Sequence, residues 1–524
     1  MGTWLQSGAG GALTLAGWLI PRRVAAARIA VGPAIVVDLL PIGLAVTVLL
    51  VATGRPIFTG LVVFALGAGL ALADRTKREV LREPVVFSDL SELPHVVTHP
   101  HLYLPFAGPG LVVGGAVAGL ASCAALLLLE PRLLAPDHTM AITCGLLVGV
   151  LGWVAAREPV LGAAATLLRR LDPIGEPVED MARLGPFAAL LVYGIIARAE
   201  RSERRARHAP QPAPFVGPLA GAAVPVVLVQ CESFFDARRL SPAIPEDMLP
   251  GWDRCRGHAA AFGRLDVSGW GANTMRTEFA ALTGISESDL GYDRFNPYHA
   301  LARAPIASLA HDLRGQGYET LCLHPFDRGF FRRDQVIPQL GFDEFLCRQS
   351  LGGSRRPPYF PDPDLARLIL EVIGSRGPRV FVFAITMGNH GPWQPNGHAI
   401  DAGLARRFDP SGVPQGSDLL RYLDGLRRSD EMLEILVEGI ERRGRDGVLA
   451  FYGDHLPSLP RAFEHFRFDD WSSDYVLWPG AAMPVRQLDL PAHRLPQLIK
   501  DALRLRDAVD TSVVVETARL DGAA

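Results

Sequence analysis

The sequence predicts a bundle of transmembrane helices followed by an α/β domain with a mainly parallel sheet. Three observations lead to this fold class. Long stretches of the first 200 residues carry no charged side chain and are long enough to cross a bilayer. The composition changes near residue 200 to the mixed charge of a water-exposed domain. Beyond that point, apolar runs alternate with amphipathic patterns, as in sheets that helices cover on both faces.

The length and charge of the chain agree with this division. At 524 residues the chain is too long for one ordinary domain. Its formal net charge of −3 gives no reason to expect a nucleic acid as a partner. We therefore predict a membrane domain of about five transmembrane helices over residues 1–200. An Arg/Pro-rich linker follows over 201–223, and then an α/β domain over 224–524.

The predicted spans differ in strength. Residues 102–129 contain no charged side chain, and similar runs occupy 33–53, 56–73 and 139–156. A fifth run, 184–197, is shorter and weaker. The uncharged first 20 residues are followed, not preceded, by arginines, which argues against a cleavable signal. They form either a further span or an interfacial helix.

The basic residues predict an orientation. They gather in three loops, which the positive-inside rule places in the cytoplasm. If 184–197 crosses, the C-terminal domain lies outside the cytoplasm. The arginines between 198 and 207 oppose this assignment, but the rule is weakest before a long translocated domain. The three loops carry Arg22, Arg23 and Arg28; Arg75, Lys77, Arg78 and Arg82; and Arg157, Arg169, Arg170 and Arg183.

The six cysteines leave the redox state open. Cys123 and Cys144 lie in predicted spans. The other four have no C-x-x-C spacing, so two disulfides and four free thiols both remain open. These four are Cys231, Cys255, Cys322 and Cys347.

Four buried strands and three amphipathic helices make up the predicted α/β domain. In such sheets, ligands bind beyond the carboxyl ends of the strands. The predicted strands are Val226–Cys231, Thr320–Leu323, Val380–Thr386 and Val448–Tyr452. The predicted helices are Ala304–Gln316, Asp364–Ser375 and Leu419–Arg442.

Polar side chains follow these strands closely. A carboxylate, a hydroxyl and an Asp-His pair are what a divalent metal needs to activate a hydroxyl nucleophile against a phosphate ester. Thr274 supplies the hydroxyl, at the start of an amphipathic stretch, and Arg333 is a suitable phosphate clamp. Taken singly, most of these residues are better explained as a helix cap, a solvated arginine or a satisfied buried histidine. The residues after strands are Glu232, His324, Asn389, His390, Asp454 and His455.

In combination, the motifs resemble the lipoteichoic acid synthase and phosphoglycerol transferase branch of the alkaline phosphatase/sulfatase superfamily. They occur in family order over about 230 residues, after helices that resemble that family's membrane part. The motifs are Glu232-Ser-Phe, Thr274-x-x-x-Glu278-Phe279, His324, Phe331-x-Arg333-Asp334-Gln335, Asn389-His390-x-Pro392 and Tyr452-Gly-Asp-His455.

The resemblance implies roles for these residues. Glu232, Thr274, Asp454 and His455 would bind a divalent metal, Mn²⁺ or Mg²⁺, with Thr274 as the nucleophile. Arg333 and His390 would be catalytic. The phosphoglycerol group would be held by His324, Phe331, Arg333 and His390, with Phe331 where the family often has tryptophan.

The resemblance also implies an activity and a location. The enzyme would move phosphoglycerol from phosphatidylglycerol to a hydroxyl of a cell-envelope glycan through a phosphothreonine. It would be a multi-pass protein of the bacterial inner membrane with its catalytic domain facing the periplasm. Phosphoethanolamine transfer, polyglycerolphosphate synthesis and a catalytically silent lipid- or glycan-binding protein remain alternatives. Sulfatase activity is not expected, because Thr274-Met-Arg-Thr lacks the C/S-x-P-x-R motif.

Overall fold

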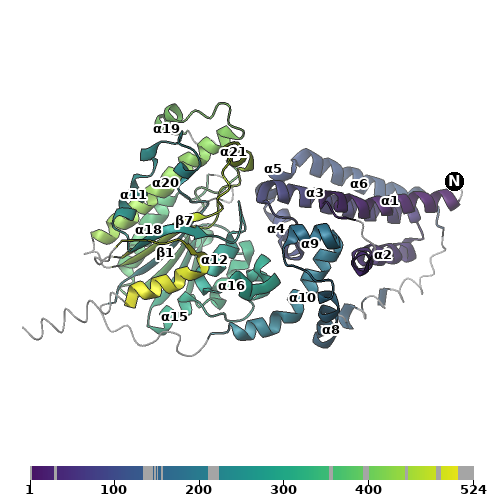
Figure 1. Ribbon diagram of the computed structural model, residues 1–524, viewed down its shortest axis with the longest axis horizontal. Coiled ribbons are helices and arrows are strands. Elements are labelled where there is room, and N and C mark those ends of the chain that lie inside the picture. Colours follow the sequence, from purple (N-terminus) through teal and green to yellow (C-terminus); the bar gives the residue numbers. More distant parts are fainter. Residues whose placement is uncertain are drawn as a thin grey trace, which may run out of the picture. The chain divides into compact units, whose positions relative to one another are not determined.

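The computed structural model divides the chain into two compact units (Figure 1). One unit comprises Met1–Glu203 with Gly291–Phe295, and the other comprises Arg204–Leu290 with Asn296–Ala524. The structure describes residues 3–28, 32–133, 157–210, 223–352, 358–393, 400–442, 447–479 and 485–504, with short pieces at 145–146, 149, 152–154 and 354.

The first unit is helical. Three of its described helices are long and apolar enough to cross a membrane: α2 (Pro33–Thr53), α3 (Pro56–Leu81) and α6 (Pro109–Leu129). Candidate membrane helices are therefore present where the runs 33–53 and 56–73 and most of the run 102–129 predicted them. Its other helices are α1 (Thr3–Val24), α4 (Leu93–Thr98), α5 (Pro100–Ala107), α8 (Glu158–Arg169), α9 (Pro177–Leu184) and most of α10 (Pro186–Arg207).

Two predicted spans differ from the observed helices. The run 102–129 is divided between α5 and α6, because Gly108 has a φ of 74° and a proline follows it. The run 184–197 is interrupted at Gly185, and the apolar part of α10 ends before Arg198. That part is about 18 Å long, less than the roughly 30 Å of a hydrocarbon core. The predicted span 139–156 lies largely outside the described residues.

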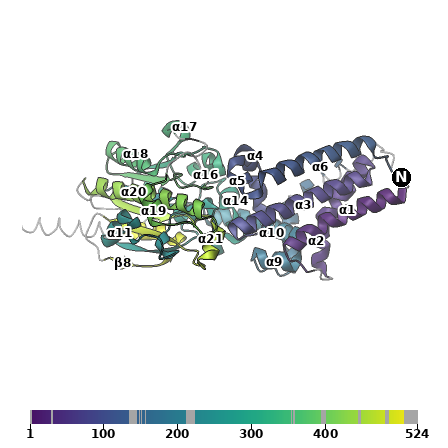
Figure 2. The same ribbon diagram turned by 90° about the horizontal axis from the view of Figure 1, so that it is seen from above.

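The N-terminal segment forms α1, which packs closely along α3 (Figure 2). Glycines make this approach possible. A Cβ atom on Gly60 would overlap the backbone of Gly10, and one on Gly67 would overlap the backbone of Gly17. Small residues that let two helix backbones approach closely are typical of helix pairs in membranes.

The second unit contains a mixed sheet of nine strands in the order β4-β3-β5-β1-β6-β7-β2-β8, with β9 paired to β2. The four predicted strands are confirmed as β3, β5, β1 and β6, which lie side by side in this order and are parallel to one another. Strand β7 is antiparallel to both β6 and β2. The strands are β1 (Val226–Cys231), β2 (Ala261–Asp266), β3 (Glu319–His324), β4 (Glu344–Cys347), β5 (Val380–Ile385), β6 (Val448–Gly453), β7 (Ser473–Pro479), β8 (Arg486–Gln487) and β9 (Leu490–Pro491).

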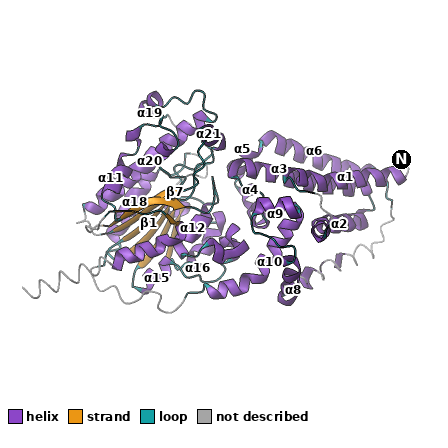
Figure 3. Ribbon diagram, in the orientation of Figure 1, coloured by secondary structure: helices purple, strands orange, loops and turns teal. Residues whose placement is uncertain are grey.

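Helices cover both faces of this sheet (Figure 3). Alternate residues of β1 point to opposite faces, so Val227 and Val229 belong to one core and Val226 and Leu228 to the other. The first core is closed by α11 (Pro250–Gly257), α18 (Asp362–Ser375) and α20 (Gly416–Glu441); the second is closed by α12 (Thr274–Thr283), α15 (Leu309–Gly315) and α16 (Arg333–Gln339).

The predicted helices are present with shifted ends. The clearest shift is at α15, which begins at Leu309 because the Ser308 side chain accepts a hydrogen bond from the backbone N–H of His311. The cysteines of this unit are free thiols, all buried.

Candidate active site

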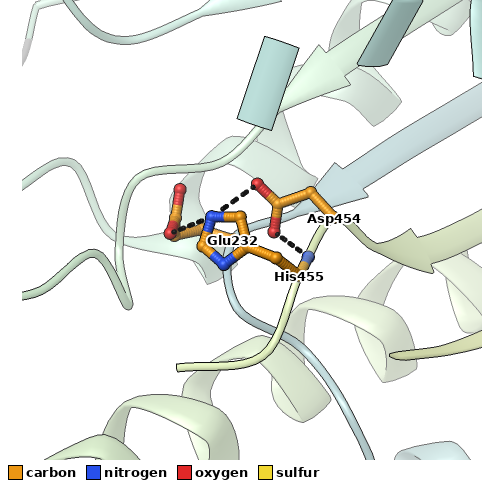
Figure 4. Close-up of side chains that lie close together, drawn as sticks. All are labelled: Glu232, Asp454 and His455. Atoms are coloured by element: carbon orange, nitrogen blue, oxygen red, sulfur yellow. Dashed lines mark hydrogen bonds and ion pairs between the residues drawn. The ribbon is translucent and has the colours of Figure 1, made fainter. Parts of the chain in front are cut away.

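The carboxyl ends of β1 and β6 bring three ligand-type side chains together (Figure 4). Cys231 pairs in register with Gly453, so Glu232 and the Asp454-His455 pair leave neighbouring strands at the same edge. Their ligand atoms all lie within 4.8 Å of one another, and all three side chains are buried. The sequence-predicted convergence at this sheet edge is therefore present in the fold.

His455 is oriented as a ligand. Its Nδ1 lies 2.9 Å from the Leu456 carbonyl oxygen, which can only accept, so Nδ1 carries the proton. The lone pair on Nε2 then faces three oxygen atoms. It lies 3.3 Å from Thr274 Oγ1, 3.4 Å from Asp454 Oδ2 and 3.6 Å from Glu232 Oε1.

The electrostatics of this cluster fit a cation. Asp454 Oδ1 accepts hydrogen bonds from the backbone N–H groups of Ser233 and His455, each at 2.9 Å. Asp454 Oδ2 is buried and has no hydrogen-bond partner among the described residues. Burial and the nearby Asp454 charge raise the pKa of Glu232 to about 8. Buried carboxylates of this kind are costly without a compensating charge, and a divalent ion would supply it.

Thr274 enters the cluster from α12, of which it is the first residue. The side chain of Thr277 donates a hydrogen bond of 2.8 Å to the Asp454 carbonyl oxygen, which fixes the helix against the loop after β6. The free N–H groups and the dipole at this helix end would stabilise a phosphorylated hydroxyl. The position therefore suits a nucleophile that carries a phosphoryl group.

Backbone crowding requires a glycine beside the cluster. A Cβ atom on Gly453 would overlap the carbonyl oxygen of Phe234, which follows the Glu232 turn. The Tyr452-Gly-Asp-His motif therefore has a steric reason for its second residue.

Arg333 lies in the interior, in a fixed position. Its Nε and Nη2 atoms donate to the two oxygens of Glu278 at 3.0 and 2.6 Å, and its Nη1 lies 3.2 Å from His324 Nε2. The side chains of both Arg333 and Glu278 are almost fully buried. Each Nη atom of an arginine has two hydrogens, so this pairing leaves donors for a further oxygen ligand.

His324 supports Arg333. Its Nδ1 lies 3.3 Å from the Ile385 carbonyl oxygen, so its Nε2 is the acceptor for the arginine. Burial and the charge of Arg333 hold the pKa of His324 well below its usual range. A histidine that stays neutral in this way positions its neighbour and does not exchange protons at ordinary pH.

His390 and Phe331 complete the predicted set. The Nδ1 atom of His390 lies 2.5 Å from the Gly391 carbonyl oxygen, and burial lowers its pKa. Its ring is therefore neutral at ordinary pH, with Nε2 able to accept a proton. The Phe331 ring lies 5.3 Å from Arg333 Cζ, so it packs over the guanidinium group.

The sequence did not reveal the role of Glu278. It appeared in the Thr274 motif without a function. In the fold it binds Arg333, accepts a hydrogen bond of 3.0 Å from Gln230 Nε2 and is contacted by the Tyr298 hydroxyl. The sequence shows a carboxylate four residues after Thr274, in a predicted amphipathic stretch. Its partner Arg333 lies 55 residues further along the chain, so the spacing of the motifs could not identify it.

Replacing Glu278 should strongly destabilise the protein. We expect Glu278→Gln to lower the free energy of unfolding by about 3–5 kcal/mol, because Arg333 would keep its buried charge without a partner. Denaturant unfolding of the full chain in detergent measures this. The matched control is Arg367→Gln, which breaks the exposed pair with Asp364 and should change little. Equal stability of the two variants would contradict the assignment.

Comparison with known proteins agrees with the fold. Residues 226–485 match the family Sulfatase. A capsular polysaccharide biosynthesis protein, RkpI, of Rhizobium meliloti is 29% identical over 83% of this chain and 81% of its own length. A "Putative cyclic beta-1,2-glucan modification protein" of the same organism is 31% identical over 45% of this chain and 36% of its own length.

A solved structure shares the fold over nearly the whole chain. The integral membrane lipooligosaccharide phosphoethanolamine transferase A of Neisseria meningitidis matches 94% of this chain and 95% of its own, with a TM-score of 0.53 and 14% identity. The fold thus defines a chain with candidate membrane helices followed by an α/β domain of sulfatase type. The C-terminal domain belongs to the sulfatase family.

Proposed function

We propose that this protein is a metal-dependent phosphoglycerol transferase that moves the head group of phosphatidylglycerol to a hydroxyl of a cell-envelope glycan. The supporting observation is the convergence of Thr274 Oγ1 on His455 Nε2, together with Glu232 and Asp454. A nucleophile among metal ligands, at a helix N-terminus, is suited to covalent phosphoryl transfer.

The first step forms a bond between Thr274 Oγ1 and phosphorus and breaks the bond to the diacylglycerol oxygen. A neutral His390 takes up the proton of Thr274 and returns it to the leaving alkoxide. Arg333, held by Glu278, directs its remaining N–H groups to the phosphoryl oxygens. The product is a glycerophosphoryl ester of Thr274.

The proposed metal is Mn²⁺ or Mg²⁺, held by Glu232, Thr274, Asp454 and His455. When bound, it supplies positive charge that favours deprotonation of the threonine and offsets charge on the phosphoryl oxygens. Its ligands come from two neighbouring strand ends and one helix, so the chain fixes them before substrate binds.

The acceptor and donor are proposed on different grounds. The names of the two Rhizobium relatives refer to glycans, which supports a glycan acceptor over a growing glycerol-phosphate polymer. The Phe331-x-Arg333-Asp334-Gln335 motif favours phosphoglycerol as the transferred group. Phosphoethanolamine transfer is the second candidate, because a phosphoethanolamine transferase shares the fold over both units.

The test measures the release of diacylglycerol by the purified full chain. Labelled phosphatidylglycerol and labelled phosphatidylethanolamine are supplied in separate reactions, each with added Mn²⁺ and with a chelator in its place. Metal-dependent release from phosphatidylglycerol alone supports the proposal. Release from phosphatidylethanolamine alone would establish the second candidate. Head-group binding without release from either lipid would indicate a silent binding protein.

We further propose that the catalytic domain faces the periplasm, where a surface glycan is accessible. Because α10 is too short to carry this assignment by itself, a direct measurement is needed. Ser375 is exposed at the end of α18. On a background without native cysteines, Ser375→Cys should react with a membrane-impermeant thiol reagent in intact spheroplasts. Labelling only after lysis would place the domain in the cytoplasm.

A further inference from the structure

A cavity of about 140 Å³ lies at the start of α18, beside the loop that follows β5 and the first half of α20. Of the residues that line this cavity, only His390 has a role in the proposed cleavage of the lipid donor. The residues that matter for its chemistry are Tyr359, Asn389, His390, Trp393, Arg421 and Arg428.

Two buried polar atoms in the cavity wall have no hydrogen-bond partner among the described residues: Asn389 Nδ2 and the Tyr359 hydroxyl. The two side chains are only 2% and 7% exposed. Buried polar groups without partners are rare, and at the wall of a cavity they indicate a ligand that supplies the partner.

The amide of Asn389 is held in one orientation. Its Oδ1 accepts a hydrogen bond of 3.1 Å from Trp393 Nε1, so its NH₂ group is the unsatisfied end. The side chain rests against α20 at Gly425, where a Cβ atom would overlap Asn389 Oδ1. The unsatisfied donor is therefore positioned by packing on both sides.

The cavity adjoins the proposed reaction centre through His390. The ring centroids of Tyr359 and His390 are 5.8 Å apart. Burial and the negative charge of Glu232 raise the pKa of Tyr359. A ligand in the cavity would thus lie next to the residue proposed to move protons.

The composition of the wall suits a neutral polyhydroxyl ligand. Among the described lining residues, Arg428 pairs with Asp424 at 2.7 Å, and the one further arginine, Arg421, is matched in number by one further carboxylate, Asp362. A wall with balanced charge does not favour a second phosphate. Tyr359 and Trp393 add amphipathic aromatic surface with hydrogen-bonding edges, which suits the apolar faces and hydroxyls of a sugar ring.

We propose that this cavity binds a sugar residue of the acceptor glycan, with Asn389 and Tyr359 contacting its hydroxyls. The proposal rests on the proposed transferase function for its catalytic consequence. An acceptor hydroxyl gives its proton to His390, its oxygen forms a bond to phosphorus, and the bond from phosphorus to Thr274 Oγ1 breaks. The proton returns from His390 to Thr274 Oγ1, which regenerates the enzyme.

The test uses two conservative variants of the full chain in detergent. Tyr359→Phe removes one hydroxyl, and Asn389→Asp replaces the NH₂ donor while keeping an oxygen for Trp393. The matched control is Tyr475→Phe, which removes a hydroxyl bonded to the Leu488 carbonyl oxygen away from the cavity. The probe is a neutral glucan oligosaccharide, whose binding is measured by calorimetry on the Thr274→Ala background, so that no turnover is required.

We expect each cavity variant to weaken glucan binding about tenfold and the control to leave it unchanged. In the Thr274 enzyme, the ratio of transfer to donor cleavage should fall by a similar factor. Unchanged glucan affinity in both folded variants would overturn the proposal. The proposal would also be overturned if the two cavity variants weakened the binding of glycerol phosphate and left glucan binding unchanged. Glucan binding without any lipid cleavage by the Thr274 enzyme would refute the transferase and retain the sugar site.

Discussion

Thr274→Ala abolishes transfer in our account, with a loss on the order of 10⁴-fold or more, as expected when the nucleophile of a covalent mechanism is removed. The change deletes a hydroxyl and a methyl group from the first residue of α12 and leaves its backbone hydrogen bonds in place. Folding and lipid binding should therefore persist. The measurement is diacylglycerol release and glycan labelling by the purified full chain.

The matched control is Thr274→Ser, which keeps a hydroxyl at the same helix end. It should retain measurable transfer, because the oxygen can still reach the position 3.3 Å from His455 Nε2. Substantial activity in the alanine variant would remove Thr274 from the mechanism. Equal inactivity of both variants, with loss of the folded state, would assign it a structural role.

Removing a metal ligand should lower metal content and activity together. We expect Asp454→Asn and His455→Ala to reduce metal affinity by at least about 10–100-fold, because each loses a ligand atom from a buried cluster of three. Elemental analysis of the purified full chain measures the bound metal. The outcome should be clearest for His455, whose Nε2 faces Thr274, Asp454 and Glu232.

Asp430→Asn provides the control for this experiment. Asp430 is also a buried carboxylate, but it accepts hydrogen bonds from the backbone N–H groups of Gly251 and Trp252 outside the cluster. Its variant should keep the metal. Unchanged metal content in both ligand variants would place the metal elsewhere.

The sequence predicted four of the nine described strands, and the polar residues at their ends, for a definite physical reason. Buried parallel strands are continuous apolar runs, so the runs before Glu232 and Asp454 were visible, and polar residues directly after them had to lie at one edge. The membrane helices were visible for a related reason, since a bilayer requires long uncharged segments.

Contacts between distant segments could not be predicted in this way. Glu278 and Arg333 are 55 residues apart, and their pairing depends on how α12 and α16 pack on one face of the sheet. The cavity beside His390 combines three separate segments, so its unsatisfied Asn389 and Tyr359 atoms have no signature in the sequence. The helix break at Gly108, by contrast, has a visible signature in the sequence, the pair Gly108-Pro109. The prediction gave more weight to the absence of charge over 102–129 and therefore treated that run as one span.

The central claim is that Thr274 carries the transferred group. Its most direct test is incubation of the full chain with phosphatidylglycerol alone, followed by digestion and mass analysis of the peptides. We predict a glycerophosphate adduct on Thr274 that disappears when acceptor glycan is added and is absent from Thr274→Ala. Diacylglycerol release accompanied by an adduct on another residue, or by none at all, would contradict the mechanism.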